Sequence, residues 1–306
     1  MNEIKRVLIC GIGAVGSIYA NKINEYNSDL LRILVDKNRY EKYLKSPKIF
    51  NGKELKLNYI LPEDKSYHAD LIIIATKFGG LSEVIENIKN FVGSDTIIIS
   101  LINGVTSEEI IAQKYGWKHT LLAYFIGHSA MRNGNIISHD GVGKIVYGIK
   151  DEIHTDIKDI EIVGKFFDKV GINYENPSDM PRALWLKYLL NTSSNQASAI
   201  LKMTFGQMQQ SEKYMYFMKN AMDEVIQIAK ACGINNTETM LEDALKGFAM
   251  MSPDGKTSML QDVEAKRKTE LDIFANTVIE LGEKYNISTP YNKIMKEMIE
   301  VIEENY

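Results

Sequence analysis

Three glycines near the start of the chain have the spacing of a phosphate-binding loop. They occur in Gly11-Ile12-Gly13-Ala14-Val15-Gly16, which directly follows an apolar run and opens a helical pattern. In such a loop the first glycine permits a tight turn, the second lets the backbone approach a pyrophosphate, and the third lets the helix pack against the strand. The spacing and context predict a dinucleotide site over Gly11, Ile12, Gly13, Ala14, Val15 and Gly16, with a purely structural turn as the alternative.

The residues after the second apolar run bear on the type of dinucleotide. Asp36 stands twenty residues after Gly16. A carboxylate at this position can accept hydrogen bonds from an adenosine ribose and would repel a 2′-phosphate. Lys37 and Arg39 follow directly, and either side chain could receive that phosphate. We predict NADP as the cofactor, with NAD as a possible alternative.

A second group of polar residues lies in the other half of the chain. Lys187, Asn191 and Asn195 follow one another at steps of four residues. Because each step drifts by only about 40° around a helix, the three side chains share one face. That face either is exposed to solvent or presents one cation and two amides to a small polar substrate in a cleft.

Four further residues are candidates by position. Lys77 and Asn103 each follow a predicted strand, at the sheet edge where parallel sheets bind ligands. Turn residues precede Thr257 and Ser258, so one of these two should cap a new helix. Ser258, with Gln261 three positions later, matches a helix capping box, which is its structural alternative. Glu270 stands four residues after Lys266, and spacing alone predicts only a surface ion pair for it.

The elements that must position these residues differ between the two halves of the chain. In the first half, short β-branched runs alternate with helical patterns, which indicates a parallel sheet covered on both faces. Ile136–His139 and Lys144–Ile149 are expected to form an antiparallel hairpin appended to that sheet. After the proline-containing segment near residue 177 every pattern is helical, including one long helix over Ser258–Tyr285. We predict a doubly wound α/β Rossmann domain over residues 1–176 and an all-helical domain over 177–306.

The composition excludes several classes of protein. The chain has 306 residues, of which 45% are hydrophobic and 25% are charged, as in an ordinary globular protein. A net charge of −4 provides no electrostatic footprint for nucleic acid, and no apolar run approaches the roughly 20 residues of a membrane span. Two cysteines and 14 methionines suit a reducing compartment, so we expect a cytoplasmic location. The five histidines, His128 among them, lack the spacing of metal ligands, and we predict no metal.

Taken together, these motifs resemble the ketopantoate reductase (2-dehydropantoate 2-reductase) family over essentially the whole chain. The resemblance rests on the glycine loop, Thr76-Lys77, Asn103-Gly104, the Trp185-to-Asn195 segment, and Ser258-Met259 through Asp262 to Arg267 and Thr269-Glu270. It implies a Rossmann domain and a helical domain with the active site in the cleft between them. It also implies reduction of ketopantoate to (R)-pantoate by hydride transfer from NADPH, in the pathway to pantothenate and coenzyme A.

The resemblance also implies a role for each candidate residue. Lys187 would be the general acid, Asn191 and Asn195 would hold the substrate, and Ser258 would bind its carboxylate end. Glu270 would position the lysine or the cofactor ribose. The implied cofactor contacts near the closing cleft are Lys77 and Asn103, and helical domains of this type often form homodimers.

The chain departs from the family pattern at two positions. Phe205 precedes Gly206, and Gly255 stands three residues before Ser258, where family members often carry asparagines that would bind the hydroxyl end of ketopantoate. An NAD-dependent D-2-hydroxy acid dehydrogenase acting on branched or aromatic 2-keto acids is therefore the alternative. A dehydrogenase of 3-hydroxy acids and a non-catalytic dinucleotide-sensing module remain as further alternatives.

Overall fold

The computed structural model describes residues 3–127 and 130–306, and it divides into two compact units. The first unit ends at Met180 and the second comprises Pro181–Tyr306. This division falls a few residues after the boundary expected from the sequence, because the helix that opens the second unit begins at Met180.

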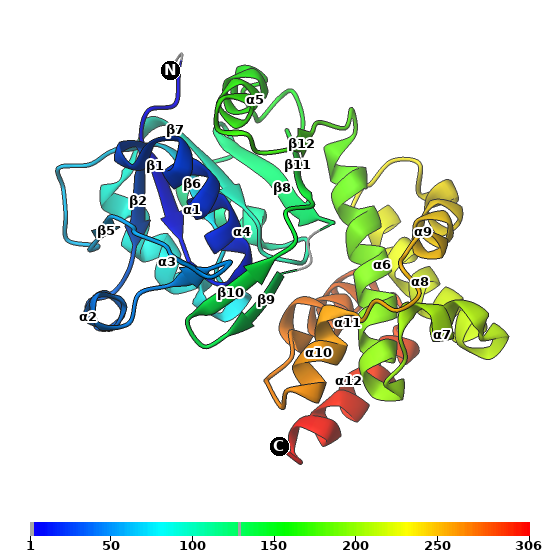
Figure 1. Ribbon diagram of the computed structural model, residues 1–306. Helices are drawn as coiled ribbons and strands as arrows, with labels where there is room; N and C mark the ends of the chain where they lie inside the picture. Colours follow the sequence, from blue (N-terminus) through cyan, green and yellow to red (C-terminus); the bar gives the residue numbers. More distant parts are fainter. Residues whose placement is uncertain (1–2, 128–129) are drawn as a thin grey trace. The chain divides into compact units, whose positions relative to one another are not determined.

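An eight-stranded sheet forms the centre of the first unit, in the order β12-β11-β8-β7-β6-β1-β2-β5 (Figure 1). The strands from β5 to β8 pair in parallel, β11 runs antiparallel to β8, and β12 is parallel to β11. Their bounds are β1 Val7–Cys10, β2 Leu31–Leu34, β5 Tyr59–Ile60, β6 Ala69–Ile74, β7 Val92–Ser100, β8 Thr120–Ile126, β11 Lys144–Gly148 and β12 Tyr174–Glu175. The α/β fold class expected from the sequence is confirmed.

Both faces of this sheet are covered, because its strands are apolar on both sides. In β1, Val7 and Ile9 join a core with one pair of helices, whereas Leu8 and Cys10 join a core with another pair. Successive strand residues point to opposite faces, so an unbroken apolar run requires cover on each. The first face is covered by α1 (Ala14–Asn27) and α5 (Lys158–Val170), and the second by α3 (Leu81–Asn87) and α4 (Ser107–Tyr115).

The hairpin expected from Ile136–His139 and Lys144–Ile149 is wrong, because the two segments belong to different sheets. The first forms β10 (Ile136–His139), which pairs antiparallel with β9 (Ala130–Asn133) across a turn at Gly134. A second, four-stranded sheet results, in the order β4-β3-β10-β9, with β3 Ile49–Phe50 and β4 Lys53–Glu54. Gly141 and Gly143 have positive φ and redirect the chain into β11 of the main sheet.

The second unit is built from helices, as expected. They are α6 Met180–Leu201, α7 Phe205–Gln210, α8 Glu212–Ala231, α9 Met240–Ala249, α10 Ser258–Glu264, α11 Ala275–Tyr285 and α12 Pro290–Glu303. Methionines such as Met208, Met218, Met222 and Met295 fill its core with less than 1% exposure. Within residues 3–127 and 130–306, none of the helices is long and apolar enough to cross a membrane.

The single long helix expected over Ser258–Tyr285 is also wrong. The helix that begins at Ser258, α10, ends at Glu264, and Lys266 adopts a left-handed φ of 49°. Arg267 then folds back: its backbone N–H donates to the Asp262 carbonyl, and its Nε lies 2.7 Å from the Asp262 carboxylate. The apolar residues of this segment keep a helical spacing, but the helix itself ends after Glu264. The bonds between Arg267 and Asp262 stabilise the interruption.

Candidate functional site

Four candidate residues of the first unit follow strands that lie side by side. β2, β1, β6 and β7 are consecutive and parallel in the sheet, so their carboxyl ends share one edge. Gly11, Asp36, Lys77 and Asn103 each stand within three residues of such an end. This is the edge at which open α/β sheets bind ligands, next to the point where the strand order reverses at β1.

The three glycines of the loop meet three different physical demands. Gly11 has a φ of +95°, and a Cβ there would lie 2.8 Å from the Ala75 carbonyl oxygen. A Cβ on Gly16 would lie 1.9 Å from the Gly11 carbonyl oxygen, so no larger residue fits without moving the loop. At Gly13, by contrast, a Cβ would meet no atom of the described residues within 4 Å. Gly13 therefore faces open space, as a glycine that lets a phosphate approach must do.

The start of α1 suits an anion. Gly13 is the N-cap residue of this helix, and as a glycine it has no side chain with which to cap the first turn. The first N–H groups of a helix lack carbonyl partners within it and lie at the positive end of its dipole. Since a Cβ on Gly13 would meet no described atom within 4 Å, the loop residues Gly11 to Gly16 fit a pyrophosphate.

Asp36 is the N-cap of α2 (Lys37–Lys45) and holds Arg39. Its Oδ1 accepts the Arg39 backbone N–H at 2.8 Å, and its Oδ2 lies 3.3 Å from the Arg39 Nε. Lys37 is exposed on the first turn of the same helix. A ribose diol or a 2′-phosphate at this edge would therefore meet one carboxylate and two cations.

Thr76, directly before Lys77 in the sequence, is a further candidate. Its Oγ1 is buried and has no hydrogen-bond partner among the described residues. Its Cγ2 lies 2.8 Å from where a Gly11 Cβ would stand, so the threonine packs against the glycine loop. A buried hydroxyl without a partner costs free energy, and a bound ligand would supply one. Lys77, next in sequence, is exposed.

Asn103 lies in the loop between β7 and α4, which a short hydroxyl chain holds in place. The Ser100 and Ser107 Oγ atoms are 2.9 Å apart, and the Ile102 backbone N–H donates to the Ser100 Oγ at 3.3 Å. Gly104 follows with a φ of +100°. Asn103 itself is half-buried within this tightly bonded loop.

In the second unit, Lys187, Asn191 and Asn195 lie on the single continuous helix α6. Lys187 and Asn191 are half-buried and Asn195 is only 6% exposed. The interpretation of this face as a solvent-exposed stripe is therefore wrong. Tyr188, beside the lysine, is fully buried and donates to the Phe274 carbonyl at 3.1 Å, and burial raises the pKa of its hydroxyl. Of these two neighbours, only the lysine is partly open to solvent.

A buried polar chain holds the C-terminal half of α6. The Glu224 carboxylate on α8 accepts the backbone N–H groups of Tyr291 and Asn292 at the start of α12, at 2.7 and 3.1 Å. The Asn292 side chain donates to Glu224 at 2.7 Å and accepts from the Gln196 amide at 3.1 Å. Burial raises the pKa of Glu224. Because Gln196 adjoins Asn195, two other helices, α8 and α12, fix how α6 is rotated at that point.

Ser258 is not the helix cap that the sequence allowed. Thr257 caps α10 instead, accepting the Leu260 backbone N–H at 3.2 Å, and Ser258 is the exposed first residue of the helix. The Thr257 hydroxyl donates to the Ser198 Oγ at 3.1 Å. Since Ser198 lies on α6 three residues after Asn195, this bond brings the start of α10 to the end of α6 that carries Asn195.

Glu270 is half-buried and precedes a short 3₁₀ turn, Leu271–Ile273. The preceding Thr269 is fastened by its N–H and its hydroxyl to the Glu303 carboxylate, both at 2.7 Å. These bonds fix the backbone on one side of Glu270. The position of Glu270 is thus defined by buried neighbours on a segment that the sequence placed inside a helix.

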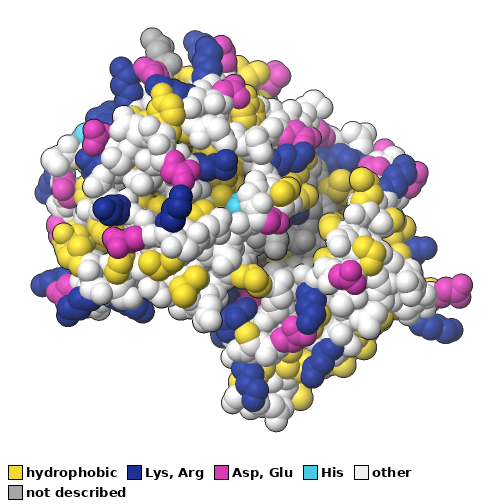
Figure 2. Space-filling view, in the orientation of Figure 1, with side chains coloured by type: hydrophobic (Ala, Val, Ile, Leu, Met, Phe, Trp, Pro, Cys, Tyr) yellow, Lys and Arg dark blue, Asp and Glu magenta, His cyan; other side chains and the backbone are white. Residues whose placement is uncertain are grey.

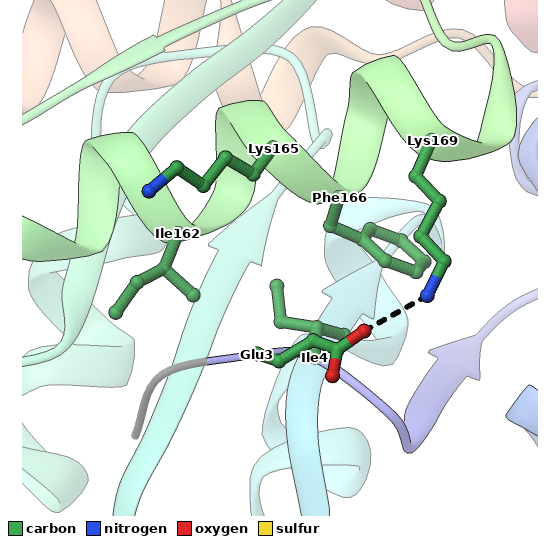
Figure 3. Close-up of a pocket in the computed structure, with 6 residues that line it drawn as sticks. All are labelled: Glu3, Ile4, Ile162, Lys165, Phe166 and Lys169. Carbon is green, nitrogen blue, oxygen red and sulfur yellow. Dashed lines mark hydrogen bonds and ion pairs between the residues drawn. The ribbon is translucent and has the colours of Figure 1, made fainter.

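Two small cavities of the first unit lie at the opposite, amino-terminal edge of its sheet. One, of about 190 Å³, is lined by Ile4, Ile162, Phe166 and Lys165, and an ion pair of 2.9 Å joins Glu3 and Lys169 at its rim (Figure 3). The other, of about 200 Å³, lies around His119 and Asp159, whose Nδ1 and Oδ2 atoms are 2.7 Å apart. Both cavities therefore lie away from the first unit's candidate residues, which stand at the carboxyl ends of the strands.

Residues 3–127 and 130–306 contain no group of three histidine, cysteine, aspartate or glutamate side chains that could hold a metal ion. His128 lies outside these described residues. Cys10 is buried, and burial strongly raises the pKa of its thiol, which keeps the thiol protonated and unreactive.

On the face in view, acidic and basic side chains are interspersed (Figure 2).

Comparisons with known proteins agree with this arrangement. Residues 7–152 match the family described as Ketopantoate reductase PanE/ApbA, and residues 179–303 match its C-terminal part. The 2-dehydropantoate 2-reductase of Streptococcus pyogenes serotype M6 is 26% identical over 301 residues, which are 96% of each chain.

Several solved structures share the fold. The ternary structure of D-mandelate dehydrogenase with NADH and anilino(oxo)acetate has a TM-score of 0.85 at 20% identity, covering 98% of this chain and 99% of that one. The 2-dehydropantoate 2-reductase from Geobacter metallireducens has a TM-score of 0.81 at 22% identity, covering 97% and 99%. A dimeric ketopantoate reductase from Staphylococcus aureus has a TM-score of 0.75 at 19% identity, covering 98% and 99%.

The two family matches together span most of the chain and include both groups of candidate residues. The glycine loop at the sheet edge and the lysine–asparagine face of α6 fall in the respective matched regions. The chain belongs to the ketopantoate reductase family, whose members are NAD(P)-dependent oxidoreductases acting on a CH–OH group.

Proposed function

We propose that this protein reduces the ketone of a 2-keto acid to a 2-hydroxy acid, using a reduced nicotinamide dinucleotide. The observation that carries the proposal is the half-buried face of Lys187, Asn191 and Asn195 on α6, in a chain whose first unit has a glycine loop that fits a pyrophosphate. A hydride adds to the carbonyl carbon and a proton adds to the carbonyl oxygen. Only the proton has to come from a side chain.

Lys187 is the residue that supplies this proton. An ammonium group polarises the carbonyl before reaction and neutralises the alkoxide as it develops. Asn191 and Asn195 lie on successive turns of the same helix face and would hold the substrate by hydrogen bonds. Ser258, exposed at the start of α10, would bind the carboxylate, and Glu270 would position the lysine or the cofactor ribose.

The loop from Gly11 to Gly16 would hold the pyrophosphate of the cofactor, which supplies the hydride when bound. Thr76 offers a hydroxyl that has no partner among the residues the structure describes, beside this loop, and Lys77 and Asn103 lie at the same sheet edge. Asp36 would accept hydrogen bonds from the adenosine ribose. These residues fit a dinucleotide in type and placement.

The pair of Asp36 and Arg39 provides a test of cofactor choice. We propose NADPH, with Arg39 and Lys37 receiving the 2′-phosphate; NADH is the second candidate because Asp36 would repel that phosphate. In R39A the KM for NADPH should rise about tenfold, as expected from one lost charge-assisted contact, while the KM for NADH stays the same. Steady-state kinetics with both cofactors measure this. K45A, at the exposed far end of α2, is the control, and equal changes for both cofactors would contradict the assignment.

The substrate is tested by following NADPH and NADH oxidation with ketopantoate, 2-ketoisovalerate and benzoylformate. The name of the Streptococcus relative supports ketopantoate, and with it a step on the way to pantothenate and coenzyme A. The contact of Phe205 with Gly255 in the helical unit favours the other two compounds. Cofactor binding without turnover of any of them would instead indicate a dinucleotide-sensing module.

Two further properties are part of the proposal. The dimeric ketopantoate reductase among the structural relatives supports a homodimer, which the molar mass in solution tests. The two free cysteines support a reducing, cytoplasmic location.

A further inference from the structure

Phe205 and Gly255 are in direct contact in the second unit. A Cβ on Gly255 would lie 2.9 Å from the Phe205 Cδ2, so the ring occupies the space that any side chain at position 255 would need. The ring also packs edge-on against Phe248, with 6.1 Å between the centroids. Phe248 in turn stacks on Tyr214 at 6.5 Å. The rings of Tyr214, Phe248 and Phe205 thus form a row, and this row ends at the backbone of Gly255.

Backbone hydrogen bonds fix this contact independently of the two side chains. The Phe205 N–H donates to the Gly255 carbonyl at 3.0 Å, and the Gly206 N–H donates to the Pro253 carbonyl at 2.8 Å. Thr204 caps α7 through a reciprocal bond with Gln207. Substitutions of the phenylalanine or the glycine therefore change the chemistry of the contact while its backbone bonds remain.

The contact lies beside the proposed substrate residues. Ser258 is three residues after Gly255, and between them Thr257 bonds to Ser198 on α6 at 3.1 Å. Ser198 also donates to the Met203 carbonyl at 2.8 Å, just before α7 begins. The end of α6 next to Asn195, the start of α7 and the start of α10 are therefore joined at one place.

We propose that the half-buried ring of Phe205 against Gly255 forms the wall that receives the substrate's side chain, so that the protein prefers 2-keto acids with branched or aromatic apolar side chains over ketopantoate. This inference rests on the proposed reduction of a 2-keto acid. A hydroxyl group placed against the ring would leave water without gaining a hydrogen bond, whereas an apolar group would lose nothing. The structural likeness to D-mandelate dehydrogenase accords with an apolar side chain.

The test compares kcat/KM for benzoylformate and 2-ketoisovalerate with that for ketopantoate in the wild type and in F205N/G255N. The wild type should favour the apolar compounds. The double variant should shift the ratio toward ketopantoate by about tenfold or more, because two amides replace an apolar wall that cannot bind the hydroxyl. F205L keeps the wall apolar and should keep the wild-type preference.

The single variants make the test sharper. G255N alone must displace the ring, and its Cβ would also lie 3.0 Å from the Ser252 carbonyl oxygen. It should therefore lower turnover of every substrate, and less so once F205N removes the ring. The effects of the two substitutions should therefore be strongly non-additive, as expected for residues in contact.

Two results would overturn the inference. One is a wild-type preference for ketopantoate, and the other is an unchanged ratio in an active F205N/G255N protein. Turnover of none of the three compounds by the wild type would remove the proposed function itself, and the inference with it. The wild-type preference is measurable even if the double variant fails to fold.

Discussion

Replacement of Lys187 by alanine is expected to lower kcat by about 10²- to 10⁴-fold, the contribution typical of a positioned general acid. The lysine is the cation of the half-buried face of α6, and the buried Tyr188 beside it faces the core. Removal of the ammonium leaves the developing alkoxide without a proton and without a compensating charge. Cofactor affinity should change little, because the residues proposed to hold the pyrophosphate lie in the other unit.

Stopped-flow or steady-state kinetics measure the first effect, and fluorescence titration with the reduced cofactor measures the second. K219A, at an exposed position of α8, serves as the matched control and should behave as the wild type. Undiminished turnover by K187A would refute the assigned role. A parallel loss of cofactor binding would instead indicate a structural effect.

The second large effect is expected at Gly16. In G16A the new Cβ would stand 1.9 Å from the Gly11 carbonyl oxygen, so the loop or α1 has to move. Overpacking of this kind costs about 1–3 kcal/mol or more, and it also displaces the helix N-terminus that would bind the pyrophosphate. G16A should therefore show both a lower thermal midpoint and greatly weakened cofactor binding, measured by calorimetry and titration.

G13A is the informative partner of that variant. Its Cβ would meet no described atom within 4 Å, and the φ of −73° at this residue is not one of the positive values that favour glycine. The thermal midpoint should stay that of the wild type while the cofactor Kd rises about tenfold, because the methyl group occupies the space through which a phosphate approaches. Unchanged cofactor affinity in G13A would place the pyrophosphate elsewhere.

Local patterns were sufficient to predict the fold class and the positions of the first unit's candidate residues. Gly11, Gly13 and Gly16 have distinct steric requirements that depend on a few neighbouring atoms. Such requirements determine the residue type, so they can be recognised in the sequence. Likewise, apolar runs such as Leu71 to Ile74 must be covered on both faces, which implies helices on each.

Elements whose structure depends on distant partners could not be predicted. β10 pairs with β9 and β3 and not with β11, a choice that the residues Ile136–His139 do not reveal. Ser258–Tyr285 has a helical pattern throughout, yet the local bond of Arg267 to Asp262 and the long-range bond of Thr269 to Glu303 stabilise a break. The place of Glu270 follows from the long-range bond of the residue before it.

The aromatic contact shows a further limit of the sequence. The absence of asparagine at positions 205 and 255 was visible in the sequence, but the direct packing of Phe205 on Gly255 was not. These residues are fifty positions apart, and the structure joins them through backbone bonds between α7 and the turn before α10.

The most direct test of the central claim is to follow the transferred hydride itself. The protein is incubated with 2-ketoisovalerate and cofactor carrying deuterium at both C4 positions of the reduced nicotinamide, and the product is analysed by mass spectrometry. We expect 2-hydroxyisovalerate with one deuterium, located at C2, and none of this product with K187A on the same timescale. Bound cofactor without any labelled 2-hydroxy acid, from this substrate, benzoylformate or ketopantoate, would contradict the central claim.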